Sequence, residues 1–151
     1  MNAEEAKESP IKIRNIDPYV QKKFDDIGKQ QFSDKILFKQ RRVNGLYCIL
    51  ITDRDGVPLL KVGSDKAPEH AMRPNFISTF GLAIDQGSKL GLGKTNTLIC
   101  SYSQFQVIQM NKLPLIVTFI TNDSCNTGHV LALEKQLNPI ISDLTLAVAE
   151  S

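Results

Sequence analysis

The feature that most constrains the fold is a pair of apolar segments joined by a turn signal. Residues 46–52 (Leu-Tyr-Cys-Ile-Leu-Ile-Thr) are rich in β-branched and aromatic side chains, which predicts a buried β-strand. Residues 53–56 (Asp-Arg-Asp-Gly) follow, and Asp-Gly is a strong short-range hairpin signal. Residues 57–62 predict the returning strand, where Pro58 should face an unpaired side or start the strand because proline lacks an N–H. The chain therefore contains a predicted β-hairpin.

The remaining segments predict further strands and two helices. Residues 75–92 form a predicted helix with Asn75 as its N-cap. Three predicted strands follow it, at residues 97–102, 104–109 and 115–121. Residues 126–148 carry apolar side chains at three- and four-residue steps, which is typical of an amphipathic helix. This order predicts an α+β sandwich in which a five-stranded antiparallel sheet carries two or three helices.

The N-terminal part differs in texture from the rest of the chain. The 151 residues fit one domain with a tail. Residues 1–33 are polar and mixed in charge, and we expect a loosely ordered extension there, followed by the folded domain at residues 34–151. Residues 19–27 and 33–42 are candidates for short amphipathic helices, the second capped by Ser33.

Charge and cysteine content argue against several classes of function. Eighteen basic and sixteen acidic residues give a net charge of +2, which is too small to indicate a nucleic-acid surface. The basic excess lies in residues 1–44, which hold ten basic and seven acidic side chains. Cys48, Cys100 and Cys125 lack the spacing of a zinc site or a disulfide framework, and predict free thiols in a reducing compartment. The apolar runs are far shorter than the ~20 residues of a membrane helix, so we expect no direct membrane insertion.

No motif for catalysis, cofactor binding or metal binding is complete. Residues 87–95 (Gly-Ser-Lys-Leu-Gly-Leu-Gly-Lys-Thr) approach a phosphate-binding loop, but Ser88 occupies the place of its first glycine and a helix precedes it instead of a strand. Residues 53–56 lack the first aspartate of a calcium loop. Ser124 and His129 have no glycine elbow or orienting acid beside them. We therefore expect no catalytic residue, no cofactor and no metal.

Small residues are unusually dense in the predicted helix at residues 75–92. They are Ser78, Gly81, Ala83, Gly87, Ser88 and Gly91. Each glycine inside a helix costs about 1 kcal/mol relative to alanine, so something is expected to approach the backbone closely. Two interpretations stay open: a partner subunit covers this helix and the neighbouring edge strand, or the glycines fit the helix onto its own sheet.

Several motifs are similar to those of a known family. They are residues 52–58 (Thr-Asp-Arg-Asp-Gly-Val-Pro), 67–74 (Ala-Pro-Glu-His-Ala-Met-Arg-Pro), 78–80 (Ser-Thr-Phe), 85–92 (Asp-Gln-Gly-Ser-Lys-Leu-Gly-Leu), 126–128 (Asn-Thr-Gly) and 133–135 (Leu-Glu-Lys). Over about residues 44–151 the sequence resembles the MEK-partner scaffold subunits of the Ragulator complex. This resemblance implies a roadblock/longin-type fold, which agrees with the order of elements predicted above.

The resemblance also implies a role in assembly. A member of this family is a non-catalytic scaffold that forms a heterodimer with a second roadblock subunit through its central helix and the adjacent strand. The pair belongs to a complex that a lipidated subunit holds on the cytosolic face of late endosomes and lysosomes, where it recruits Rag GTPases for amino-acid signalling to mTOR and scaffolds the kinases MEK and ERK. Carried over to this chain, the contact residues predicted by face and spacing are Thr79, Ala83, Gln86, Leu98 and Cys100.

The N-terminal part departs from the family, and other functions stay open. The family has a compact amphipathic helix before the first strand, whereas residues 33–43 resemble a shortened or altered version of it, preceded by an extra tail. One alternative function is a roadblock-type regulator of a small GTPase that acts as a homodimer. Another is nucleotide binding at the Gly-Lys-Thr stretch, which would depend on Lys94.

Overall fold

The computed structural model describes residues 29–64, 66–68 and 73–149 of the chain. In chain order the helices and strands are α3 (Lys29–Arg41), β1 (Leu46–Asp53), β2 (Pro58–Gly63), α4 (Pro74–Gly87), β3 (Thr97–Ser101), β4 (Phe105–Lys112), β5 (Leu115–Asn122) and α5 (Thr127–Ala149). This order confirms the predicted α+β fold class. The predicted helix at residues 19–27 and residues 1–28 of the predicted extension (residues 1–33) lie outside the described residues. Residues 29–33, predicted to belong to the extension, form the start of α3 instead.

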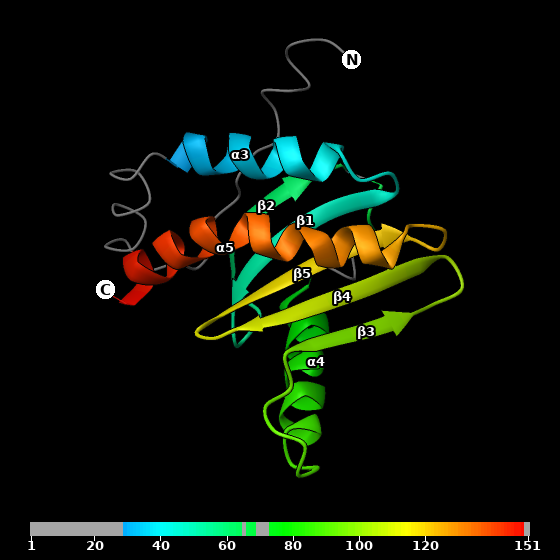
Figure 1. Ribbon diagram of the computed structural model, residues 1–151, viewed down its shortest axis with the longest axis vertical. Helices are drawn as coiled ribbons and strands as arrows, with labels where there is room; N and C mark the ends of the chain where they lie inside the picture. Colours follow the sequence, from blue (N-terminus) through cyan, green and yellow to red (C-terminus); the bar gives the residue numbers. More distant parts are fainter. Residues whose placement is uncertain (1–28, 65, 69–72, 150–151) are drawn as a thin grey trace.

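The five strands form one antiparallel sheet in the order β2-β1-β5-β4-β3 (Figure 1). The predicted hairpin joins β1 to β2, and its turn is held by Asp53 Oδ1, which accepts hydrogen bonds from the N–H groups of Asp55 and Val57, each at 2.9 Å. Pro58 begins β2 at one edge of the sheet, as its missing N–H requires. The turn chemistry therefore determines the register of this hairpin.

Helices cover the two faces of the sheet unequally. Figure 1 shows α3 and α5 in front of the sheet and α4 behind it, crossing the strands. The main core lies between the sheet and the front pair of helices. It includes Ile49, Ile51, Ile108, Val117 and Phe119 from the sheet, Ile36 from α3, and Val130, Leu133, Leu137, Ile140, Ile141 and Leu144 from α5. The apolar stripe predicted for the last helix is thus confirmed as its core-facing side.

The first described helix is longer than predicted, and its predicted cap is wrong. Helix α3 begins at Lys29, so Ser33 lies inside it instead of capping it, with only 1% of its surface exposed. Ser33 shares the buried side of α3 with Ile36, Leu37 and Gln40. The Gln40 amide donates a hydrogen bond to the carbonyl of Leu46 at 2.6 Å, which fastens the end of α3 to the start of β1. Packing against the sheet, rather than a local cap, therefore determines the extent of this helix.

The central helix is shorter than predicted at its C-terminus. Helix α4 spans Pro74–Gly87 with Arg73 at the N-cap position, so the predictions of Asn75 as the cap and of residue 92 as the end are both wrong. Proline favours the first helical turn because the N–H groups there have no helical partner. At the other end, the Ser88 hydroxyl donates to the carbonyl of Ile84 and accepts the N–H of Thr95, both at 3.0 Å. This contact turns the chain back towards β3 and stops the helix.

We predict that Ile36→Ala destabilises the fold by about 2–5 kcal/mol, because it leaves a cavity beneath α3 where the side chain is fully buried. The exposed neighbour Lys35 provides the control, and Lys35→Ala should change stability by less than about 0.5 kcal/mol. Urea unfolding of the two variants measures both values. A cost below about 1 kcal/mol for Ile36→Ala would mean that α3 does not belong to the cooperative unit.

Candidate functional site

One edge of the sheet, at β3, has an open row of backbone groups. Strand β3 pairs with β4 on one side, and no other strand in the described part of the chain pairs with its outer side. The N–H of Tyr102 donates to the carbonyl of Phe105 at 2.7 Å, and the carbonyl of Asn96 accepts the N–H of Asn111 at 2.8 Å. Because backbone groups alternate along a strand, those of the residues in between point away from β4. These outward residues are Thr97, Ile99 and Ser101.

Two predicted contact residues lie on the side of the sheet that α4 covers. Leu98 stands opposite Gln109, and Cys100 stands opposite Val107. Ile99 stands opposite Ile108, which belongs to the core beneath α3 and α5. Since opposite residues of paired strands share a face, Leu98 and Cys100 point to the α4 side, and both are half-buried.

The other three predicted contact residues lie on the outer side of α4. Ile77, Phe80 and Ile84 are buried. Thr79, Ala83 and Gln86 are exposed and follow one another at four- and three-residue steps, so they form one stripe along the helix. Thr79, Ala83 and Gln86 are all uncharged, and depletion of charge is typical of the core of a protein interface. The role of these residues in a contact stays a prediction.

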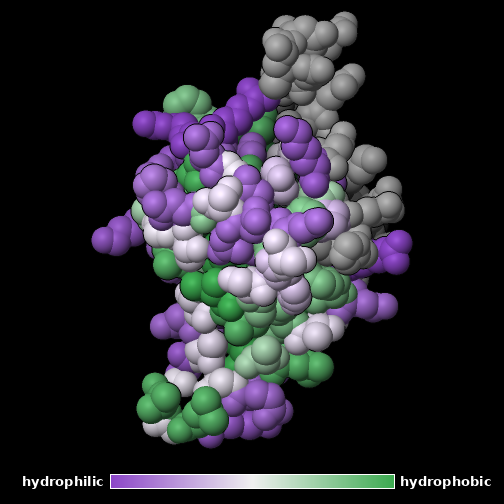
Figure 2. All heavy atoms as spheres, turned by 90° about the vertical axis from the view of Figure 1, so that its right-hand side faces the viewer, coloured by the Kyte–Doolittle hydropathy of each residue, from purple (hydrophilic) through white to green (hydrophobic). Residues whose placement is uncertain are grey.

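Exposed leucines extend the surface that the five predicted contact residues form on α4 and β3. Leu82 is 66% exposed on α4, while Leu90 and Leu92 are 72% and 87% exposed in the segment after it. Figure 1 shows α4 extending past β3, and Figure 2 shows apolar side chains gathered over the lower part of the molecule and its tip. We name this region, together with the outer edge of β3, the α4–β3 surface: Thr79, Leu82, Ala83, Gln86, Leu90, Leu92, Leu98, Cys100 and Tyr102. Exposed apolar patches of this kind mark protein–protein contacts.

Sequence reasoning missed Leu90 and Leu92 because it placed them in the helix. The signal that could have found them is the alternation of leucine with glycine at residues 90–93, which opposes a helix and leaves apolar side chains in a loop. Gly91 has a φ of 80°, a conformation that favours glycine, and an added Cβ there would meet nothing within 4 Å. The leucines therefore project from a turn with open space around it.

The dense small residues have different causes along α4. A Cβ added to Gly87 would lie 2.5 Å from Thr95 Oγ1, so the approach of the chain's own loop requires glycine there. A Cβ added to Gly81 would lie 3.8 Å from the carbonyl oxygen of Arg54, an ordinary contact. Gly87 is therefore required by the loop at Thr95 and not by a fit of the helix onto its own sheet, and the case for a partner interface rests on exposure instead.

The motifs that approach nucleotide and metal sites in sequence are used structurally. The Gly-Lys-Thr stretch lies between α4 and β3, and the N–H of its Thr95 is already bonded to Ser88. Asp53 Oδ1 holds the hairpin turn. Asn122 Oδ1 accepts the N–H of Ser124 at 3.1 Å in the loop before α5. The described residues contain no group of three or more histidine, cysteine or acidic side chains placed to hold a metal ion.

The cysteines are protonated thiols at neutral pH. Burial raises the pKa of Cys48 to about 12, although the charge of Lys61 lowers it slightly. Burial also raises the pKa values of Cys100 and of Cys125, the latter against a hydrogen bond with Thr121 that lowers it. Because the thiolate is the reactive form, the raised pKa values argue against a nucleophilic role. Cys48 and Cys125 are small buried core residues, whereas Cys100 is half-buried on the α4 side of β3.

Comparison with known proteins identifies the family of this chain. Residues 29–148, which begin with the first residue of α3, match the family described as mitogen-activated protein kinase kinase 1 interacting. The chain belongs to this family. Among its relatives, the human (Homo sapiens) Ragulator complex protein LAMTOR3 is 55% identical over 109 residues, which cover 72% of this chain and 88% of the relative. The Pagrus major protein of the same name is 52% identical over 115 residues, covering 76% and 93%.

Solved structures show which fold this chain adopts. The gliding protein MglB from Thermus thermophilus has a TM-score of 0.62 at 13% identity and covers 82% of this chain and 93% of that chain. A roadblock/LC7 domain from Streptomyces avermitilis has a TM-score of 0.53 at 12% identity, covering 70% and 92%. The roadblock-type fold implied by the sequence resemblance is therefore confirmed. In the part of this chain that the structure describes, no helix is long and apolar enough to cross a membrane.

We predict opposite effects for two glycine-to-alanine changes in α4. Gly81→Ala should raise stability by up to about 1 kcal/mol, because the helix gains propensity and the new Cβ has room. Gly87→Ala should lower stability by about 1 kcal/mol, because Thr95 must move and its hydrogen-bonded contact with Ser88 weakens. Urea unfolding measures both changes, and equal effects would contradict the explanation given for Gly87.

Proposed function

We propose that this chain is a non-catalytic scaffold subunit of a Ragulator-type complex and pairs with a second roadblock-fold subunit through the α4–β3 surface. The observation that carries the proposal is the open edge of β3 beside the uncharged stripe of α4. The name of the relatives, Ragulator complex protein LAMTOR3, supports the choice of complex. The description of the family supports an interaction with a kinase kinase of the MAP-kinase cascade.

The edge of β3 determines the orientation of the proposed partner, and the exposed leucines contribute most of the binding free energy. A second sheet that adds its own edge strand would bond to the outward groups of Thr97, Ile99 and Ser101. Each such hydrogen bond contributes about 0.5–1.5 kcal/mol net. Full burial of a leucine such as Leu92, now 87% exposed, contributes about 1.5–3 kcal/mol. The apolar side chains therefore dominate the affinity, while the strand determines the relative orientation of the two subunits.

We propose the wider assembly from the name of the relatives and the description of the family. The heterodimer joins further Ragulator subunits, one of which is lipidated and holds the complex on the cytosolic face of late endosomes and lysosomes. There the complex recruits Rag GTPases, supports amino-acid signalling to mTOR, and brings MEK and ERK together. In this arrangement the chain supplies binding surfaces, and membrane attachment comes from its partner.

A roadblock homodimer that regulates a small GTPase would use the same strand edge. The likeness to MglB shows a shared fold at 13% identity and leaves the choice between the two dimers to experiment. Purification of the chain alone and after co-expression with a second roadblock-fold Ragulator subunit separates them. We expect self-association or poor solubility alone and a stable 1:1 species after co-expression, whereas a well-behaved monomer that ignores the partner would contradict the proposal.

We predict that Ile99→Pro weakens the heterodimer at least tenfold. Proline removes the N–H that points away from β4, so it deletes a bond to the incoming strand without deleting one to β4. Ile99→Val keeps the N–H and serves as the matched control. Isothermal titration calorimetry measures affinity and thermal unfolding checks the fold. Equal affinity for both variants would exclude strand addition at this edge.

We also predict that Ala83→Lys lowers the affinity of the heterodimer at least tenfold, because it places an unpaired charge inside the contact. Ala132 is also exposed, on α5, so Ala132→Lys adds the same charge at a distant site and should leave binding unchanged. In cells, the Ala83 variant should lose its colocalisation with a lysosomal membrane marker while the Ala132 variant keeps it. Loss of binding in both variants would show a general effect of charge instead of an interface.

A further inference from the structure

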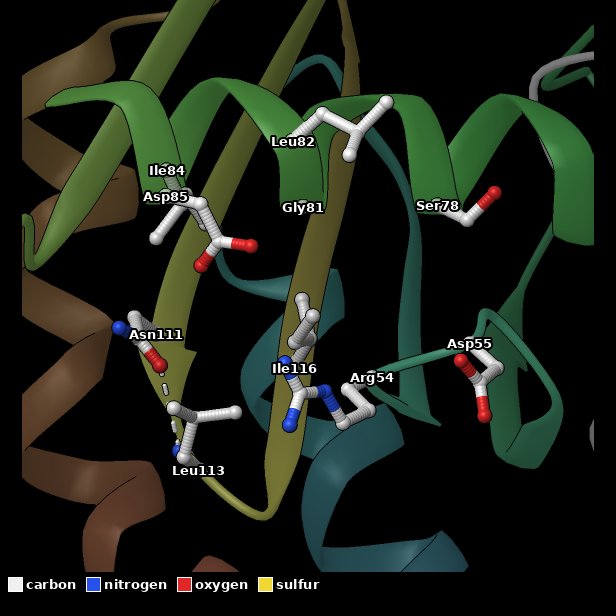
Figure 3. A pocket seen from close by; sticks show the side chains of 10 residues that line it. All are labelled: Arg54, Asp55, Ser78, Gly81, Leu82, Ile84, Asp85, Asn111, Leu113 and Ile116. Atoms are coloured by element: carbon white, nitrogen blue, oxygen red, sulfur yellow. Dashed lines mark hydrogen bonds between the residues drawn. The ribbon is translucent and has the colours of Figure 1, made fainter. Parts of the chain in front are cut away.

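A pocket of about 260 Å³ lies between α4 and two turns of the sheet. Figure 3 shows α4 above it, with the β1–β2 turn and the β4–β5 turn below. We name it the α4–turn pocket. Its lining includes Gly81, Leu82 and Ile84 from α4, Leu113 from the β4–β5 turn and Ile116 from β5. Its volume is below the ~300–1,000 Å³ of usual small-molecule sites, and it is open to solvent on one side.

The pocket combines an apolar interior with an apolar rim. Ile84 and Ile116 are almost completely buried, while Leu82 and Leu113 remain about half or more exposed. Gly81 keeps the wall of α4 open between them, because no side chain fills the space there. This arrangement can receive one apolar side chain, whose removal from water would be the main source of binding free energy.

Three charged side chains line the same space: Asp85 from α4, and Arg54 and Asp55 from the β1–β2 turn. Figure 3 shows Asp85 reaching down from α4 and Arg54 reaching in from the β1–β2 turn. Both side chains are exposed, and within residues 29–64, 66–68 and 73–149 neither has an ion-pair partner. The pocket therefore offers the carboxylates of Asp85 and Asp55 to a cation and the guanidinium of Arg54 to an anion.

Asp85 also breaks a local rule of helix stability. It lies in the last turn of α4, which carries no basic residue, so its carboxylate faces the negative end of the helix dipole. A negative charge is unfavourable at this end of a helix. Residues that oppose the stability of their own element are expected at functional sites. A cationic ligand group would relieve this repulsion, and this accounts for an acidic residue at position 85.

The pocket lies on a different flank of α4 from the proposed dimer contact. Its helical residues Ser78, Gly81 and Asp85 follow at three- and four-residue steps, whereas the uncharged stripe is Thr79, Ala83 and Gln86. Only Leu82 borders both. The α4–turn pocket can therefore stay accessible when a second subunit covers the α4–β3 surface, and the inference below goes beyond the proposed function.

We infer that the α4–turn pocket binds an extended segment of another polypeptide that carries an apolar residue between a basic and an acidic one. The apolar side chain contacts Ile84, Leu113 and Ile116, the basic side chain pairs with Asp85, and the acidic side chain pairs with Arg54. The charge complementarity of the two walls selects this occupant over an uncharged apolar segment. The small, open shape suits one side chain of a longer chain rather than a free small molecule.

The test uses the full-length chain, alone or with its co-expressed partner, and methyl NMR at Leu82, Ile84, Leu113 and Ile116. The probes are blocked tripeptides (acetylated and amidated) of sequence Lys-Leu-Glu and Glu-Leu-Lys, with Gln-Leu-Gln as the neutral control and free leucine as the small-molecule control. We expect saturable shifts of these methyl groups and about threefold or greater preference for one charged tripeptide over Gln-Leu-Gln, as two exposed ion pairs permit.

Charge exchange supplies the decisive variant. The double change Arg54→Asp with Asp85→Arg should invert the preference between Lys-Leu-Glu and Glu-Leu-Lys, and both sites are exposed, so the fold should persist. Asp85→Asn alone and Arg54→Gln alone should each reduce the preference, which covers the case in which the double variant does not fold. Asp143→Arg on the exposed side of α5 is the control and should change nothing. An uninverted preference, equal binding of free leucine, or no saturable shift would overturn the inference.

Discussion

The unequal covering of one sheet is the constraint on which the rest of this structure depends. Strand β5 is buried from Leu115 to Thr121, and most of β1 and β4 is also buried, so both faces of the sheet need cover. Two helices, α3 and α5, cover one face and build the main core. The single helix α4 covers the other face while crossing the strands (Figure 1). Helix α4 packs next to β3 and extends past it, so the outer edge of β3 and the end of α4 remain exposed.

This geometry gives α4 two flanks, to which we assign different proposed contacts. Thr79, Ala83 and Gln86 form an exposed, uncharged stripe that we propose as part of the contact with a second sheet, while Ser78, Gly81 and Asp85 open into a separate pocket. The buried thiol of Cys48 stays protonated because its pKa is raised to about 12. On these grounds we propose that the chain acts by holding other proteins in place, with a different partner on each flank of α4.

A shared fold and a similar sequence indicate different things about this chain. At 13% identity, MglB keeps the same arrangement of sheet and helices, because many apolar sequences can fill the same core. At 55% identity, the LAMTOR3 relatives share much more than the core pattern requires. Assignment to the family therefore rests on sequence, while roadblock architecture alone is compatible with different partners and activities.

Local pattern in the sequence determined the strands, the hairpin and the last helix. Turn chemistry at residues 53–56 and the apolar stripe of α5 act over a few residues, so they can be recognised without the fold. The uncharged residues of α4 could also be predicted by helical spacing. The tertiary structure decided the rest: Ser33 is buried by packing against the sheet, and the contact of Ser88 with Thr95 ends α4 at Gly87 and exposes Leu90 and Leu92. Arg54 and Asp85 share a pocket only because a turn and a helix distant in sequence meet there. Such contacts depend on how whole elements pack, and no local pattern encodes that.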